Sequence, residues 1–151
     1  MGEFTGGCQC GAVRYRLTAR LRNPHLCHCR MCQKAFGSYF AALAAVEREA
    51  VEWTRGAPSF YRSSQAAERG FCTRCGTPLT FASVDQPMLC VSLGALDDPA
   101  AVPPRRAYGL ESKVPFFAGL DGLPGARTEE AHTPEEMARM AKAGDMIVCL
   151  G

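Results

Sequence analysis

The segment HLCHCRMCQKAF, residues 25–36, carries three cysteines in close succession: Cys27, Cys29 and Cys32. Thiolates packed this closely suit a metal ion, and a C-x-C-x-x-C run can wrap one zinc ion from a single side. Tetrahedral zinc takes four ligands, and catalytic zinc sites keep one position for water or substrate. The triplet therefore predicts a zinc centre with an open position.

Four more cysteines stand in two short motifs, CQCG at 8–11 and CTRCG at 72–76. Each motif ends in glycine, as zinc knuckles do, because the turn around the metal often requires a positive φ. Free or paired cysteines are the competing interpretation, but paired knuckles are among the more specific sequence signals. We expect a closed structural zinc site that joins two hairpins through Cys8, Cys10, Cys72 and Cys75.

The fourth ligand of the triplet stays open from the sequence. Cys90 lies in an apolar run and is expected to be a core thiol, whereas Cys149 lies near the end of the chain. His25 is expected to be solvated, and His28 to point away from its neighbouring ligands. If one of these residues completes the shell, the second site is structural. A site that fills only with substrate or excess zinc is a further alternative.

Positive side chains flank the triplet at Arg30 and Lys34. They could offset the charge of the thiolates or hold a carboxylate of the substrate. Arg62 and Lys113 are weaker candidates for the same role. Solvated surface charge is an equally good interpretation of each residue taken separately.

Composition limits the classes of protein that the chain can represent. Its 151 residues fit one domain, with 47% hydrophobic and 21% charged residues. A formal charge of +2 gives no support for a nucleic acid or a membrane surface as partner. The sequence predicts neither a signal peptide nor a membrane span, so we expect a cytoplasmic protein. Clustered cysteines in a reducing compartment favour metal binding over disulfides.

Short strand-like runs separated by glycine and proline must position these cysteines. Val13, Tyr15 and Leu17 alternate with polar residues, which is typical of a half-buried strand. The pattern predicts a mainly β, mostly antiparallel fold. The expected strands form an N-terminal hairpin, 3–8 and 11–19, followed by runs at 38–46, 50–54, 59–63, 77–83 and 87–93.

One late helix is predicted at 134–143. Thr133 is the expected N-cap, Pro134 the first helical residue and Glu136 the partner in a capping box, while Gly144 suits the C′ position. Its apolar stripe of Met137, Met140 and Ala141 indicates packing more often than a binding face.

Three blocks, GGCQCGAVRY, CHCRMCQKAFGSYF and GFCTRCGTPLTF, resemble the glutathione-dependent formaldehyde-activating enzyme family, which includes the centromere protein V-like proteins. The resemblance covers residues 3–124 and leaves 125–151 as an extension that carries the helix. It implies an Mss4-like β tent, a structural zinc on the four knuckle cysteines and a catalytic zinc on the triplet. Phe116 and Ala107 stand where the family usually has a tryptophan and often a histidine.

The resemblance implies a carbon–sulfur lyase that forms or cleaves S-hydroxymethylglutathione from glutathione and formaldehyde. Zinc on three thiolates carries a formal charge of −1, so it is better suited to orienting a thiolate than to activating water. Two alternatives stay open: an enzyme of the same type with another thiol or aldehyde, and a non-catalytic zinc module that binds a partner protein.

Overall fold

The computed structural model of the protein describes residues 3–141, and these residues form ten strands in two sheets. The small sheet has the order β1-β2-β5, and the large sheet has the order β10-β3-β4-β9-β8-β7-β6. The mainly β prediction is therefore confirmed. The strands of the small sheet are β1 Phe4–Gly7, β2 Arg14–Leu17 and β5 Val51–Arg55. Those of the large sheet are β3 Arg22–Cys27, β4 Ala41–Glu47, β6 Ser59–Arg62, β7 Ala67–Phe71, β8 Pro78–Ser83, β9 Met88–Ser92 and β10 Arg106–Tyr108.

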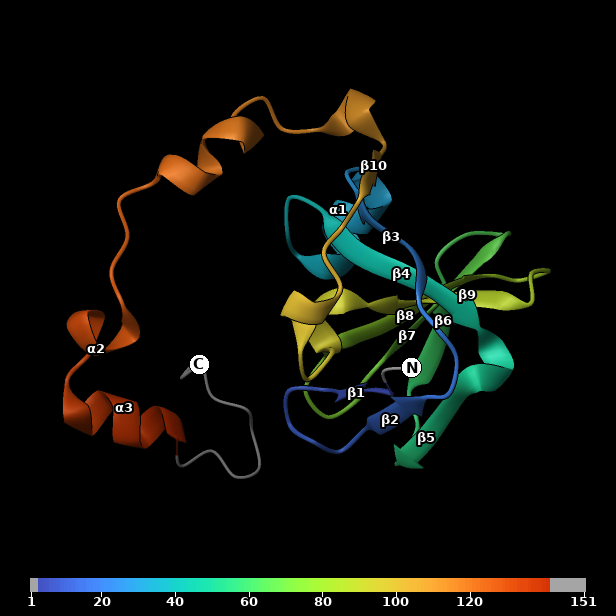
Figure 1. Ribbon diagram of the computed structural model, residues 1–151, viewed down its shortest axis with the longest axis horizontal. Coiled ribbons are helices and arrows are strands. Elements are labelled where there is room, and N and C mark those ends of the chain that lie inside the picture. Colours follow the sequence, from blue (N-terminus) through green and yellow to red (C-terminus); the bar gives the residue numbers. More distant parts are fainter. Residues whose placement is uncertain (1–2, 142–151) are drawn as a thin grey trace.

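Neighbouring strands are antiparallel, except that β10 pairs with β3 in parallel. In Figure 1 the small sheet lies below the strands of the large sheet, and the α-helix α1, Arg30–Phe36, lies near the top. This arrangement gives the large sheet one face toward the small sheet and another toward α1.

Strand β4 places apolar side chains on both faces of the large sheet. Residues on opposite sides of a strand alternate, and here both sets are apolar. Ala44 and Val46 belong to the main core between the two sheets, where Tyr15 and Leu17 are each 1% exposed. Leu43 belongs to a second cluster with Cys32 of α1. The large sheet is thus the layer that connects the main core to the cysteine triplet.

The predicted late helix is present, but it is one of three α-helices in the described chain. They are α1, α2 Thr128–Ala131 and α3 Pro134–Ala141. The capping box at the start of α3 is confirmed, because Glu136 N donates to Thr133 Oγ1 and Thr133 N donates to the Glu136 carboxylate. The predicted end of this helix and Gly144 lie outside the described residues. The short 3₁₀ helices are Arg48–Ala50, Leu93–Ala95, Pro99–Ala101, Leu110–Ser112 and Phe117–Gly122.

The chain after β10 contributes little to the cores. Among the described residues, none beyond Val102 is buried, and Figure 1 shows α2 and α3 lying away from the sheets. Within residues 3–141, no helix has the length and apolar character needed to cross a membrane.

Asp97 ties the small sheet to the segment after β9. Its carboxylate accepts two hydrogen bonds from Arg14, at 2.8 and 2.5 Å, and one from Thr5. These donors, Arg14 first, hold the pKa of Asp97 below its usual value although partial burial opposes them. A lowered folded-state pKa means that this stabilisation is present above about pH 4 and is lost as the pH falls through the folded-state value.

We therefore expect Asp97→Asn to lower the free energy of unfolding by about 1 kcal/mol at pH 7, a figure reduced for solvent screening of a partly exposed pair. Urea denaturation at pH 7 and below pH 4 measures the effect, and the difference from wild type should shrink at the lower pH. Asp85→Asn is the control, because Asp85 is exposed. Equal losses for the two variants would contradict the role of Asp97.

Candidate metal centres

The four knuckle cysteines converge at the junction of the two sheets. The loop between β1 and β2 supplies Cys8 and Cys10, and the loop between β7 and β8 supplies Cys72 and Cys75. All four Sγ atoms lie within 4.8 Å of one another. Three of the four residues are buried, so a metal held here would be enclosed by protein.

Both loops that carry these cysteines turn at a glycine, which follows the first cysteine by three residues in one loop and by four in the other. In each, the glycine after the second cysteine donates its N–H to the carbonyl of the first: Gly11 to Cys8 at 3.1 Å and Gly76 to Cys72 at 2.8 Å. Gly11 has φ 72° and Gly76 has φ 76°, so the expected positive φ is confirmed at both. Val13 N donates to Cys8 Sγ at 3.2 Å, a contact that stabilises a thiolate.

The triplet lies at the end of β3 and the start of α1. Cys27 ends the strand, Cys29 is the N-cap of the helix and Cys32 lies in its first turn. Cys29 Sγ accepts the backbone N–H of Cys32 at 3.4 Å, so the second ligand candidate also caps the helix. All three Sγ atoms lie within 4.8 Å of one another. Cys32 is buried, whereas the other two are half-buried.

In each cluster one thiol has a pKa below its usual value. Burial opposes ionisation of Cys75, yet the Thr77 hydroxyl and backbone N–H groups lower its pKa to about 6. Burial likewise opposes ionisation of Cys29, but its pKa is lowered because the Cys32 N–H and the two neighbouring thiols donate to its sulfur. A thiolate is the form of cysteine that binds metal.

The sulfur separations fit zinc. Four sulfurs at about 2.3 Å from a tetrahedral zinc lie roughly 3.8 Å apart. The Sγ–Sγ separations are 3.6 Å for Cys8–Cys10, 3.9 Å for Cys10–Cys72 and 3.5 Å for Cys27–Cys29. None of these pairs is a disulfide, since the cysteines are free. Both clusters could therefore hold a metal ion without rearrangement of the backbone.

Within residues 3–141, no fourth ligand joins the triplet cluster. His25 is not solvated as expected: it is 9% exposed, and its Nδ1 lies 2.7 Å from the Asn23 carbonyl oxygen. His28 is buried against the rings of Phe40 and Phe117, outside the sulfur cluster. Cys149 lies outside the described residues.

Cys90 differs from the buried thiol that was expected. It is half-buried and packs against the apolar cluster around Cys32, on the α1 side of the large sheet. Burial, and then the charge of Cys32, raises the pKa of Cys90 to about 11. Because its sulfur lies outside the group of three that could share a metal ion, Cys90 is not part of the triplet cluster.

The chain after β10 covers the triplet. Tyr108 accepts the N–H of His28 at 2.8 Å through its carbonyl. Gly109 has φ 66°, and a Cβ on it would lie 2.6 Å from the backbone nitrogen of Cys29, so only glycine fits there. Gln33, 5% exposed, donates from Nε2 to the carbonyls of His28 at 2.8 Å and Ser112 at 2.9 Å. This cover fixes the backbone that carries the ligand candidates.

Arg30 and Lys34 both line a pocket of about 530 Å³ beside α1. The guanidinium of Arg30 donates to the side-chain oxygen of Gln33. The pocket thus brings the two predicted cations to one surface of α1, the helix that carries Cys32, although no cysteine lines it. Lys113 lies over the ring of Phe117 at 4.8 Å, and Arg62 donates to the Gln65 carbonyl. The remaining lining residues of the pocket are Gln33, Gly37, Ser38, Tyr39 and Val114.

Sequence reasoning missed Arg69 of β7. This residue is 5% exposed, and its Nη2 donates to Cys32 Sγ at 3.5 Å. The available signal was its position in AERGF, directly before the second knuckle, where a charged residue interrupts a strand that has Ala67 and Gly70 buried.

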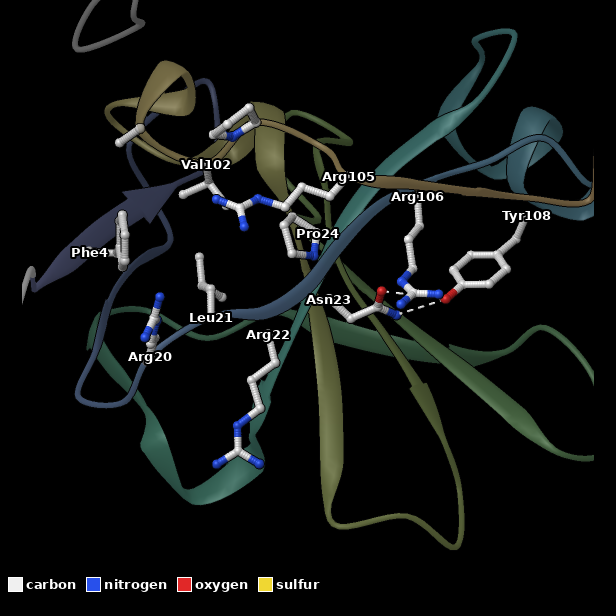
Figure 2. A pocket seen from close by; sticks show the side chains of 12 residues that line it. Phe4, Arg20, Leu21, Arg22, Asn23, Pro24, Val102, Arg105, Arg106 and Tyr108 are labelled. Atoms are coloured by element: carbon white, nitrogen blue, oxygen red, sulfur yellow. Dashed lines mark hydrogen bonds between the residues drawn. The ribbon is translucent and has the colours of Figure 1, made fainter.

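A larger pocket, of about 810 Å³, lies at the β3–β10 edge and is lined by no cysteine (Figure 2). Figure 2 shows the guanidinium of Arg106 beside Asn23 and Tyr108, which share a hydrogen bond of 3.1 Å. Four arginines contribute to its lining, and one of them, Arg22, forms an ion pair with Glu47 at 2.7 Å. Both cysteine clusters lie outside this pocket.

Two sheets linked by four cysteines, with three further cysteines beside a short helix, define a mainly β protein with two candidate metal centres. The same fold occurs in a crystal structure of a Rhodobacter sphaeroides protein, with a TM-score of 0.54 and 22% identity over 68% of this chain and 98% of that one. Residues 3–111 match the family described as glutathione-dependent formaldehyde-activating enzyme. The chain belongs to this family, so the resemblance found in the sequence is confirmed.

Two relatives are similar over different lengths. An uncharacterized lyase of Schizosaccharomyces pombe is 38% identical over 84 residues, which cover 54% of this chain and 59% of that protein. A protein of Halomonas elongata, provisionally named as a glutathione-dependent formaldehyde-activating enzyme, is 26% identical over 142 residues, 88% of this chain and 90% of that one. The match to the first relative spans less than two thirds of its length.

Proposed function

We propose that the protein is a zinc-dependent carbon–sulfur lyase that forms or cleaves the adduct of a thiol and an aldehyde, with glutathione and formaldehyde as the first candidates. The observation that carries this proposal is the triplet of buried Cys32 and half-buried Cys27 and Cys29, which has no fourth ligand within residues 3–141. Membership of the family and the names of the relatives support a lyase.

The two clusters have different roles in this proposal. The knuckle cysteines hold a structural zinc that joins the sheets, because four sulfurs, three of them in buried residues, fill a tetrahedral shell and leave no position for a substrate. The triplet holds the second zinc, giving two zinc ions per chain. Bound there, zinc would supply a position at which a substrate thiol is held as its thiolate.

The chain contributes orientation and electrostatics to the reaction. In the forward direction the thiol sulfur bonds to the carbonyl carbon, and the carbonyl electron pair takes the proton that the thiol gives up. The reverse direction breaks the same carbon–sulfur bond. Arg30 and Lys34 hold a substrate carboxylate in the adjoining pocket, so that the sulfur approaches from one side. The cover formed by Gly109 and Ser112 holds the triplet rigid around that position.

Three finer assignments belong to the same proposal. The fold is a member of the Mss4-like β-tent group, supported by its two sheets and its zinc-type knuckles. The catalytic domain spans residues 3–124, and 125–151 is an extension. The protein works in the cytoplasm, where thiols stay reduced.

The test uses protein in which cobalt replaces zinc. Adding glutathione should strengthen the sulfur-to-cobalt charge-transfer absorption, because a further thiolate joins the three cysteines. The zinc protein should also shorten the approach to equilibrium between formaldehyde, glutathione and their adduct. Thiol binding without acceleration would favour another aldehyde, in agreement with the departures at Phe116 and Ala107.

No spectral change with any small thiol would contradict the proposal and favour a zinc module that binds a partner protein. Cys90→Ala is the matched control for loss of a nearby sulfur, and it should behave as wild type in both measurements.

A further inference from the structure

Arg69 is a buried cation whose guanidinium makes few hydrogen bonds in the described part of the chain. Its pairing neighbours in the large sheet are Tyr61 of β6 and Phe81 of β8. Its Nε and Nη1 atoms are inaccessible to water and have no hydrogen-bond partner in the described part of the chain. The guanidinium carbon lies 4.8 Å from the centroid of the Phe81 ring, and Nη2 donates to Cys32 Sγ at 3.5 Å.

A buried cation costs free energy unless an anion compensates it. The ion pairs found among residues 3–141 do not include Arg69. The adjacent carboxylate, Glu68, forms its ion pair with Arg48 at 3.1 Å. The sulfur of Cys32 is therefore the group that can supply negative charge to Arg69.

The surroundings of Arg69 strengthen this interaction. On the side of Ala35 and Phe36 of α1, a pocket of about 240 Å³ separates the helix from β6, β7 and β8. Aromatic and apolar side chains dominate its walls, and Arg69 itself is 5% exposed, so its guanidinium interacts with a nearby charge more strongly than it would in water. The residues that share this pocket with Arg69 include Phe36, Tyr61, Phe71, Pro78 and Thr80.

We propose that Arg69 is the charge-balancing residue of the triplet centre. This role rests on the proposed zinc site. It differs from the role of Arg30 and Lys34, which hold a substrate carboxylate. Three thiolates and one zinc ion carry a net charge of −1, which the guanidinium brings to zero. A thiolate as fourth ligand adds another negative charge beside the same cation. Arg69 therefore favours both the binding of metal and the binding of an anionic substrate sulfur.

Arg69 acts through Cys32 and is a positioning residue rather than a catalytic one. A charge-assisted hydrogen bond in a water-poor site contributes enough to change an equilibrium roughly 10- to 100-fold. We expect Arg69→Met to weaken the triplet's affinity for its zinc by about this factor. The affinity of the cobalt-substituted triplet for a thiol should fall by a similar factor, whereas Arg69→Lys should lose less of either affinity.

The experiment compares Arg69→Met, Arg69→Gln and Arg69→Lys with Arg62→Met. Arg62 lies on the neighbouring strand and bonds to the Gln65 carbonyl, so its loss tests a nonspecific effect of positive charge. Competition with a chromophoric chelator measures the affinity for the second zinc equivalent. Thermal melting and retention of the first zinc equivalent verify that each variant is folded. Two uncharged variants, Arg69→Met and Arg69→Gln, keep the test valid if one of them misfolds.

Two thiols separate the possible partners of Arg69. In Arg69→Met and Arg69→Gln, the cobalt-substituted triplet should bind both 2-mercaptoethanol, which is uncharged, and glutathione more weakly than in wild type. Cobalt spectra should show that the two thiol affinities fall by the same factor. A loss confined to glutathione would mean that Arg69 binds a substrate carboxylate, and it would overturn charge balancing. Unchanged metal and thiol affinities in a folded neutral variant would also overturn it.

The experiment distinguishes failure of the role of Arg69 from failure of the lyase proposal. If the wild-type cobalt protein binds no thiol but the neutral variants still lose metal affinity, the lyase proposal fails and the role of Arg69 stands. If the wild type binds thiol and accelerates the reaction while the neutral variants match it in metal affinity, the lyase proposal stands and the role of Arg69 fails.

Discussion

Replacing Cys72 by serine is expected to lower the free energy of unfolding by more than about 4 kcal/mol and to release one zinc ion per chain. Cys72 is 1% exposed, and its knuckle lies between β7 and β8 of the large sheet. The opposite knuckle, with Cys10, lies between two strands of the small sheet. Zinc bound at this junction would contribute directly to the free energy of folding, because an unfolded chain does not hold the four sulfurs together.

Thermal melting together with zinc analysis measures the effect. Cys10→Ser should give the same result, since either substitution leaves three sulfurs at a closed site. Cys90→Ala is the matched control, because it removes a sulfur near the other cluster and should cost only some packing. Wild-type melting and full zinc content in either knuckle variant would contradict the four-cysteine site.

The sequence was most informative where short-range chemistry decides the structure. The two knuckles are predicted from the spacing of their cysteines and from the glycines at 11 and 76, whose positive φ is a local requirement of the turn. The alternation around Tyr15 located β2 because one face of that strand is buried. The capping box of α3 is equally local, since Thr133 and Glu136 bond across three residues.

The missed strands lack such local patterns. β3 contains Pro24 and an Asn23 with φ 45°, and its pairing with β4 shifts register before His25, so the run does not alternate. β10 has three residues, all of them exposed, and pairing with β3 forms it. β7 includes Arg69, a charge that tertiary contacts bury. Each of these strands depends on partners that are distant in the sequence.

Helix α1 was missed for a different reason. It has seven residues, its N-cap is Cys29 and not one of the usual capping side chains, and its buried residues are only Cys32 and Gln33. The one ordinary signal is Gly37, which has φ 58° at the C-cap. The run 38–46 was therefore assigned to a strand from its first residue, although β4 begins at Ala41.

Because the triplet lies at the start of this helix, loss of a triplet cysteine should affect the fold less than loss of a knuckle cysteine. We expect Cys29→Ser or Cys32→Ser to lose about one zinc per chain and to abolish acceleration of the thiol–aldehyde reaction, while most of the fold persists. The helix lies on the outer side of the large sheet, and the main core is on the other side. Loss of a ligand at an open site removes the position for the substrate sulfur without separating the sheets.

The two triplet variants should differ in stability by a small amount. Cys29 caps α1 through the Cys32 N–H, and serine also accepts such a bond, so Cys29→Ser should keep the helix. Cys32 is buried against Leu43, so Cys32→Ser should cost about 1–3 kcal/mol through a polar group in an apolar cluster. Zinc analysis, melting and the rate of approach to equilibrium measure the three effects.

The variant Cys90→Ala tests whether Cys90 is a fourth ligand of the triplet zinc or only packs beside it. Cys90 packs near Cys32 but lies outside the group of three sulfurs, so its removal should leave two zinc ions and the full rate. Loss of a zinc in this variant would mean that Cys90 completes the shell, and the open position would then be ruled out. Global unfolding of both triplet variants would make the second zinc a structural one, since only a site that holds the sheets together would have that effect.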